Sequence, residues 1–302
     1  MSFKVVKAGF LSSVQDYGRF GHAKHGMSQS GVMDEQAYAW GNYLLNNHFN
    51  DAAIEITFGG LELVAKCDTF VAVTGADLNF KINGERTKMW HTLKVSCGDI
   101  LTWGVANCGV RAYLTVKGGI QTQLLFDSRS TNLREGIAQA LVQDDELPCK
   151  PYSGVNYRFT PAKFIPNYID DLTLRMLPSY QFDEFSIEQK ELFFNQSYRI
   201  SNANDRSGCR LDGAAIALPK QGMISEGVSY GSVEISSDGL PIIILKDGPS
   251  IGGYRKIGTV FSLDLAKLAQ KQAHSKVRFK LITIFEAQRE RKLFNNFFKI
   301  EA

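Results

Sequence analysis

Several features common in other classes of protein are missing from this 302-residue chain. Its five cysteines are an odd number and include no CxxC pair, so we expect neither a disulfide framework nor a zinc knuckle. No stretch of about 18 apolar residues and no apolar signal-peptide core occur, which predicts a cytoplasmic chain without a membrane span. The 34 Lys and Arg nearly balance the 31 Asp and Glu, and a net charge of +3 does not indicate a nucleic-acid or membrane partner.

Signatures of common enzyme classes are absent as well. There is no GxGxxG, GxxxxGK[ST] or HExxH pattern, and Gly26-Met27-Ser28-Gln29-Ser30 misses the GxSxG pattern at its last position. The sequence by itself therefore shows neither a nucleotide-binding fold nor a hydrolase nucleophile turn. His22 and His25 lack a recognisable third ligand, so we expect no metal site.

Glycine and aromatic residues are plentiful, and they favour a sheet-rich fold with tight turns. The chain has 27 Gly, 20 Phe and 11 Tyr, and short apolar runs of strand length recur along it. Helices are expected near 34–45 with Asp34 as cap, near 186–194 with a Ser186/Gln189 capping box, and over Leu263–Gln270. The expected strands are Ile54–Thr57, Leu61–Val64, Phe70–Thr74, Leu78–Ile82 before an Asn83-Gly84 turn, Ile100–Trp103, Val110–Val116, Leu172–Met176, Pro241–Leu245 and Val277–Phe285.

A change in composition divides the chain. Four of the eight prolines fall between residues 143 and 168, and proline stiffens the backbone and removes donors. We expect residues 1–150 to form an N-terminal β domain, residues 151–168 a proline-rich connection, and residues 169–302 a C-terminal β domain. Many strands and few short helices in each half favour two β-barrel-like domains.

The first candidate binding segment is glycine-punctuated and contains Asp16 and Arg19. Gly18 and Gly21 leave the backbone free to approach a ligand, and Arg19 can hold a carboxylate or phosphate with two hydrogen bonds. Asp16 can orient Arg19 or act as a base. The alternative is a structural loop in which Asp16 and Arg19 form a surface pair and Asp34 only caps the helix.

Other segments have the same character. A strand ending at Gly118-Gly119 precedes Ser128-Arg129-Ser130, which can bind an anion or form a simple Ser/Thr turn. Further on, Arg206 and Arg210 lie in a polar stretch, and Gly252-Gly253-Tyr254 stands before a basic pair.

Taken in order, these segments resemble the family of the second-subunit domain of allophanate hydrolase, also called the biotin-dependent carboxyltransferase family. The family includes the Kip-antagonist protein and the third subunit of bacterial ATP-dependent 5-oxoprolinase, and the resemblance runs from about Ala8 to Ile284. The matching pieces are Gln15-Asp16-x-Gly18-Arg19-x-Gly21, Ser30-Gly31-x-Met33-Asp34, Glu55-Ile56-Thr57, Thr74-Gly75-Ala76, Arg111-x-Tyr113-Leu114, Gly118-Gly119-Ile120, Ser128-x-Ser130-Thr131, Asp205-Arg206-x-Gly208-x-Arg210-Leu211-x-Gly213 and Gly252-Gly253-Tyr254.

The resemblance implies a fold of two cyclophilin-like β-barrel domains in tandem with a few short helices. It implies a subunit, inactive alone, of an ATP-dependent complex that opens pyroglutamate to L-glutamate. The implied partners are a first-subunit, Kip-inhibitor-like protein and a LamB/YcsF-type protein. ATP serves the complex, without assignment to one subunit, and no biotin is attached here because Met-Lys occurs nowhere.

Two other functions remain open on the resemblance. One is the carboxyltransferase half of a biotin-dependent, urea carboxylase-like system. The other is a non-enzymatic regulator that binds a kinase-inhibitor partner.

The same resemblance nominates site residues and shows departures from the family pattern. The family commonly has Gly where this chain has Asp127, and Gln where it has Glu234. The loss of a Gln, and the change of the residue after Tyr254 from the family's Pro to Arg255, alter hydrogen bonding near a ligand. The nominated catalytic residues are Asp16, Arg19 and Arg206. The nominated substrate-binding residues are Gln15, Ser30, Gly118, Gly119, Ser128, Arg129, Ser130, Arg210, Gly252, Gly253 and Tyr254.

Overall fold

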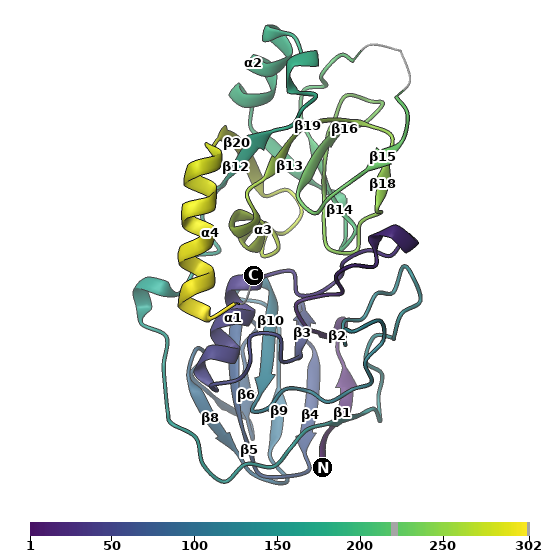
Figure 1. The fold of residues 1–302 in the computed structure, drawn as a ribbon. Helices are drawn as coiled ribbons and strands as arrows, with labels where there is room; N and C mark the ends of the chain where they lie inside the picture. Colours follow the sequence, from purple (N-terminus) through teal and green to yellow (C-terminus); the bar gives the residue numbers. More distant parts are fainter. Residues whose placement is uncertain (219–222, 301–302) are drawn as a thin grey trace. The chain divides into compact units, whose positions relative to one another are not determined.

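The computed structural model describes residues 1–218 and 223–300, and the chain divides into two compact units (Figure 1). The first unit contains Met1–Arg19, Ser30–Ile169 and Asn296–Ala302, and the second contains Phe20–Gln29 and Asp170–Asn295. Both units are built mainly from strands, so the expected mainly β class is confirmed. The proline-rich residues 151–168 count with the first unit, where Thr92 N donates to Arg158 O at 2.9 Å.

The first unit consists of two antiparallel sheets. The six-stranded sheet has the order β11-β1-β4-β9-β6-β7, and the five-stranded sheet has the order β2-β3-β10-β5-β8. Asn83-Gly84 forms the expected hairpin turn between β6 and β7. The strands are β1 Ser2–Ala8, β2 Leu11–Gln15, β3 Ala53–Thr57, β4 Leu61–Ala65, β5 Thr69–Asp77, β6 Lys81–Ile82, β7 Glu85–Arg86, β8 Thr92–Val95, β9 Ile100–Thr102, β10 Cys108–Val116 and β11 Glu146–Pro148.

One hydrophobic core lies between these sheets. Phe3 of β1 and Leu63 of β4 come from one sheet, Ile54 of β3 and Val73 of β5 from the other, and all four are fully buried. In β4 buried residues alternate with half-buried ones, as the two-residue period of a strand requires. Truncating one such Leu or Ile to Ala costs about 2–5 kcal/mol.

Helix α1, Glu35–Leu44, packs on β5 and β10 of the first unit. The side chain of Asp34 accepts from Ala37 N, so the expected helix and its cap are confirmed. Gly41 is required inside this helix because a Cβ would lie 2.7 Å from Thr115 Cγ2.

The second unit contains a closed barrel with the strand order β12-β19-β16-β17-β14-β13-β20. β12 and β20 pair in parallel, and the other neighbours in the barrel are antiparallel. A separate ribbon pairs β15 with β18. The strands are β12 Leu172–Pro178, β13 Tyr198–Asn204, β14 Gly208–Asp212, β15 Glu226–Gly227, β16 Ser232–Ile235, β17 Pro241–Ile244, β18 Ile251–Gly252, β19 Arg255–Val260 and β20 Lys276–Leu281.

The helices of the second half of the chain agree with expectation in two cases and differ in one. α2, Ile187–Asn195, begins with the expected Ser186/Gln189 capping box, and α3 spans Ser262–Leu268. The strand expected over Val277–Phe285 is wrong beyond Leu281, where β20 ends, and Ile284 and Phe285 instead begin the 15-residue helix α4, Ile284–Phe298. Short 3-10 helices occur at Ala23–His25, Ala162–Phe164 and Phe182–Glu184.

Candidate functional site

The buried carboxylate of Asp16 joins two loops of the first unit. Asp16 follows β2 and is 2% exposed. Its Oδ1 accepts hydrogen bonds from Gly18 N at 2.9 Å, Ser128 Oγ at 2.7 Å and Ser130 Oγ at 2.6 Å, and its Oδ2 accepts from Arg129 N at 2.6 Å. One carboxylate therefore fixes the Ser128–Ser130 loop against the end of β2.

Arg19 belongs to the same cluster but is not held by Asp16. Arg19 is 2% exposed, and its Nη2 donates to the Ser130 carbonyl at 2.6 Å. In the described part of the chain no ion pair joins Asp16 and Arg19, so the expected pair is wrong: the loop donors occupy the carboxylate. A base must reach the proton that it removes, so this buried, four-fold bonded carboxylate is better suited to positioning than to proton transfer.

Four other nominated residues have structural roles in the chain. Gln15 is fully buried and donates from Nε2 to Thr131 O at 3.0 Å, and Ser30 is fully buried with a φ of 54°. Gly118 N donates to Asn47 Oδ1 at 2.9 Å and Gly119 N to Val116 O at 2.8 Å. Both amides therefore already have acceptors within the chain.

A strained turn presents the Ser128–Ser130 loop. Leu125 N donates to Ser128 O at 2.8 Å across the turn, and Phe126 and Asp127 have φ angles of 53° and 61°. Two consecutive left-handed residues are usual for Asn-Gly turns and uncommon for phenylalanine. Asp127 tolerates this conformation, which glycine adopts without strain.

Beside this loop lies a cavity of ≈350 Å³, to which Arg129 contributes. Ser128, Ser130 and Thr122 also line it. Arg129 Nη2 reaches Gln121 Oε1 only at 3.4 Å, while Arg129 Nε and Thr122 Oγ1 are buried without a hydrogen-bond partner. The cavity thus combines one cation with two unused donors. Thr122 was missed by the sequence analysis, since nothing in the local pattern distinguishes it.

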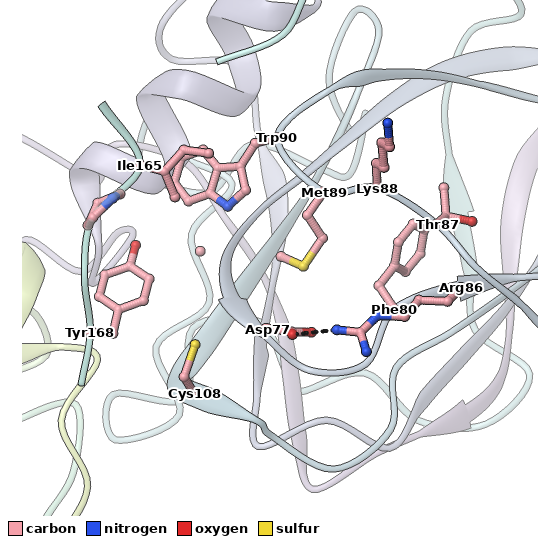
Figure 2. A pocket seen from close by; sticks show the side chains of 12 residues that line it. Asp77, Phe80, Arg86, Thr87, Lys88, Met89, Trp90, Cys108, Ile165 and Tyr168 are labelled. Atoms are coloured by element: carbon pink, nitrogen blue, oxygen red, sulfur yellow. Dashed lines mark hydrogen bonds and ion pairs between the residues drawn. The ribbon is translucent and has the colours of Figure 1, made fainter. Parts of the chain in front are cut away.

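Figure 2 shows a second cavity of the first unit, with a volume of ≈310 Å³. Its walls include the rings of Trp90 and Tyr168 and the side chain of Met89, and Arg86 Nη2 lies 2.8 Å from Asp77 Oδ2. The charge of Arg86 is therefore balanced within the cavity wall, unlike that of Arg129. This second cavity is the poorer candidate for a small anion.

Three of the motifs behind the family resemblance meet in one buried network. Tyr168 Oη donates to Asp34 Oδ2 at 2.9 Å, and Asp34 N donates to Tyr113 Oη at 2.7 Å. Tyr113 Oη in turn donates to Glu55 Oε2 at 2.7 Å, and Arg111 Nε lies 3.7 Å from Glu55 Oε1. Burial raises the pKa of both Tyr113 and Tyr168 well above the usual value, so both phenols stay protonated donors. These motif residues hold the fold together.

The nominated arginines of the second unit are engaged in ion pairs. Arg206 Nε lies 2.8 Å and Nη2 3.1 Å from the two oxygens of Asp247, and both side chains are nearly buried. Arg210, on β14, pairs with Asp238, which also belongs to the Asp238-Gly239 hairpin turn between β16 and β17. The guanidinium of Arg206 therefore forms a bidentate ion pair with Asp247, and this pair stabilises the second unit.

Gly252 of the second unit lies against a buried carboxyl group. Glu234 of β16 is 4% exposed, its Oε1 has no hydrogen-bond partner, and a Cβ on Gly252 would overlap that oxygen. Burial is the main cause that raises the pKa of Glu234, opposed by Lys256 and reinforced by Glu226. Lys256 Nζ itself lies 2.8 Å from Glu226 Oε1.

The remaining nominated positions of the second unit are more open. Gly253 has Ser225 Oγ as its nearest neighbour for an added Cβ, at 3.3 Å, and Tyr254 is 42% exposed. The first unit groups Gln15, Asp16, Arg19, Ser128, Arg129 and Ser130.

Neither a metal centre nor a membrane-spanning helix is present in the described ranges. Residues 1–218 and 223–300 hold no group of three His, Cys, Asp or Glu side chains able to bind a metal ion. His22 and His25 have ring centroids 6.4 Å apart. None of the helices in these ranges is both long and apolar enough to span a bilayer.

Comparison with known proteins identifies relatives along nearly the whole chain. The C subunit of 5-oxoprolinase from Haemophilus influenzae is 31% identical over 93% of this chain and 91% of its own length, and that of Escherichia coli is 29% identical over 98% and 96%. Urea amidolyase of Lachancea kluyveri is 28% identical over 92% of this chain but only 17% of its own length. The crystal structure of Kluyveromyces lactis urea amidolyase superposes with a TM-score of 0.90 at 26% identity, covering 98% of this chain and 20% of that one.

A family model described as carboxyltransferase domain, subdomain A and B, matches residues 25–281. That range includes the Ser128–Ser130 loop of the first unit and all seven strands of the barrel of the second. This chain belongs to the family of carboxyltransferase domains built from subdomains A and B.

Proposed function

We propose that the chain is one component of an ATP-dependent 5-oxoprolinase complex, which opens pyroglutamate to L-glutamate. The observation that carries this proposal is the extent of the matches. They cover 91% and 96% of the two relatives named as the C subunit of 5-oxoprolinase, but only 17% of the urea amidolyase of Lachancea kluyveri. The likeness therefore extends over nearly the whole length of the two 5-oxoprolinase subunits.

The reaction sets clear demands on the site. A lactam is stabilised by amide resonance, so its opening is coupled to ATP: the lactam oxygen takes the γ-phosphoryl group and ADP leaves. Water then adds to the activated carbon and the C–N bond breaks, which frees the amine and leaves an acyl phosphate. A second water hydrolyses this acyl phosphate, giving glutamate, ADP and phosphate. Such chemistry needs donors that are already oriented toward the developing negative charge.

The first unit supplies one cationic candidate for this work. Arg129 lines the ≈350 Å³ cavity, and Asp16 fixes its backbone through the 2.6 Å hydrogen bond. Arg19 supports the same loop by its bond to the Ser130 carbonyl. We assign Arg129 to substrate binding, and Asp16 and Arg19 to positioning.

The reaction also requires a site for ATP and a group that can act as a base, and we propose that partner subunits supply them. The sequence has no phosphate-binding glycine loop of the P-loop type, and the carboxylate of the first-unit cluster is occupied by protein donors. We therefore propose a Kip-inhibitor-like first subunit and a LamB/YcsF-type protein as partners. ATP acts in the assembled complex.

A second candidate is the carboxyltransferase half of a biotin-dependent system. Its support is the matching family model and the TM-score of 0.90 to urea amidolyase of Kluyveromyces lactis. In that role the same cavity would accept a small urea-like substrate, and a biotin carrier would come from another chain.

Co-expression tests these assignments. The chain is produced with its Kip-inhibitor-like and LamB/YcsF-type partners, and ADP release is followed with and without L-pyroglutamate. We expect one co-eluting complex and ATP hydrolysis that depends on pyroglutamate. A folded, complete complex that hydrolyses no ATP with pyroglutamate, but carboxylates urea when given carboxybiotin, would establish the second candidate instead.

A further inference from the structure

We propose that the cavity lined by Arg129 and Thr122 binds a small molecule that carries both a carboxylate and an N–H donor. The inference rests on the proposed function and locates the substrate carboxylate within it. At ≈350 Å³ the cavity lies at the lower end of the range typical of small-molecule sites, which suits a compact ligand.

The guanidinium of Arg129 is the anchor for the carboxylate. Within the described residues no carboxylate lies within ion-pair distance of it, and its one side-chain hydrogen bond, to Gln121 Oε1, is 3.4 Å long. Its Nε is buried without a partner. A partly buried cation without a counter-ion is unfavourable. The two oxygens of a ligand carboxylate would supply both a counter-ion for the guanidinium and acceptors for its unused N–H groups.

The backbone of Arg129 is already fixed before any ligand arrives. Arg129 N donates to Asp16 Oδ2 at 2.6 Å, and Ser130 N donates to Ser128 Oγ at 3.0 Å on the other side of the residue. The left-handed turn at Phe126 and Asp127 restricts the loop further. Such a loop loses little freedom on binding, which favours affinity for a small ligand.

Thr122 provides a second, independent observation. Its hydroxyl is buried and has no hydrogen-bond partner, although it lines the same cavity. Buried hydroxyl groups are nearly always paired, so an unpaired one beside a cavity points to a partner from outside the chain.

Two acidic residues narrow the class of ligand. Asp145 and Glu146 also line the cavity, and they already accept hydrogen bonds from Val142 N and Ser2 Oγ. The negative charge of these two carboxylates disfavours a dianion such as phosphate, but their oxygens can accept a hydrogen bond from an N–H group of the ligand. A lactam acid, with one carboxylate and one ring N–H, satisfies this combination, whereas a neutral amide lacks the group that Arg129 requires.

Direct binding to the full-length chain tests the proposal. Ligand-observed NMR and calorimetry compare L-pyroglutamate, 2-pyrrolidinone, which is the same ring without the carboxylate, and inorganic phosphate. We expect saturable binding of pyroglutamate and at least tenfold weaker binding of the other two. Phosphate binding at equal or higher affinity, or no binding of pyroglutamate at millimolar concentration, would overturn the proposal.

Variants connect the binding to these residues. Arg129→Gln should weaken pyroglutamate binding tenfold or more, and Arg129→Lys should weaken it less. Thr122→Val should weaken it several-fold while leaving the melting temperature of the free chain unchanged, because the hydroxyl has no partner there to lose. Arg86→Gln, at the second cavity, is the matched control and should bind as the wild type does.

The same variants separate this inference from the proposed function. In the reconstituted complex, Arg129→Gln should raise KM for pyroglutamate by about tenfold or more, and Arg129→Lys should raise it less. An active complex whose KM is unchanged by Arg129→Gln refutes the site and leaves the function standing. A complete complex that is inactive with pyroglutamate, although the chain binds it through Arg129, refutes the function and supports the site.

Discussion

Replacing Asp16 tests whether its carboxylate organises the Ser128–Ser130 loop. In Asp16→Ala, the backbone N–H groups of Gly18 and Arg129 and the hydroxyls of Ser128 and Ser130 lose their acceptor. The two serine oxygens still accept from Ser130 N and Asp16 N, and their hydroxyls can rotate toward other acceptors. Each orphaned buried donor costs about 1–3 kcal/mol, and removal of the buried charge offsets part of the sum. We expect a loss of about 2–4 kcal/mol, or a fall of roughly 5–15 °C in melting temperature.

Asp16→Asn gives the sharper comparison because it preserves size. One face of the new amide is a donor, so either Arg129 N or the Gly18 side meets a donor instead of an acceptor. The expected loss is about 1–3 kcal/mol, from one unsatisfied pair. Asp183→Ala, at a side chain 97% exposed, is the control and should stay within about 0.5 kcal/mol of the wild type.

Differential scanning fluorimetry on the full chain and turnover of the complex are measured side by side. Our account predicts that stability and turnover fall together in both Asp16 variants, because the loop that holds Arg129 is released. An Asp16→Asn chain that melts like the wild type but has no turnover would show that Asp16 is a catalytic base, and would refute the reasoning.

Three further predictions follow from single groups. The pKa of Glu234 is raised from its usual 4.5, so the folded state holds this proton more tightly than the unfolded state, and the ionised residue lowers stability as pH rises above 4.5. Glu234→Gln should therefore stabilise the chain more at pH 7 than at pH 4. Equal changes in the free energy of unfolding at the two pH values, measured with denaturant, would contradict this. Burial raises the pKa of Cys149 to about 12, so iodoacetamide at pH 8 should label exposed Cys97 well before Cys149, and mass spectrometry that finds the reverse order would disprove it. Gly31→Ala should cost about 2 kcal/mol or more, because Gly31 has a φ of 98° and a Cβ would lie 2.5 Å from Tyr17 O; an unchanged unfolding free energy would count against that geometry.

The parts of the fold that could be predicted are those set by local signals. The Asp34 and Ser186 caps, the Asn83-Gly84 turn and the central strands follow from turn chemistry and apolar runs. Helix α4 was missed although Thr283 and Glu286 form a capping pair, with Thr283 N donating to Glu286 Oε2 at 3.0 Å. The apolar run before it looked like a continuing strand, and the Thr-x-x-Glu spacing marks where it stops.

The candidate site was predictable as a set of segments but not as a set of contacts. Sequence proximity suggested an Asp16–Arg19 pair, whereas the carboxylate binds a loop more than 110 residues away, with Ser128 Oγ at a separation of 112. Sequence patterns identify which residue types gather, but long-range pairing decides which donor reaches which acceptor. For the same reason, Gly118 and Gly119 looked like anion donors, although Asn47 and Val116 accept from their amides in the folded chain.

The most direct test of the account is an omission experiment on the reconstituted complex. Glutamate and ADP formed from L-pyroglutamate and ATP are quantified for the complete set of subunits and for the set without this chain. The account predicts one ADP per glutamate in the complete set and no glutamate when this chain is left out. Glutamate formation at an undiminished rate without the chain would contradict its role as an essential subunit.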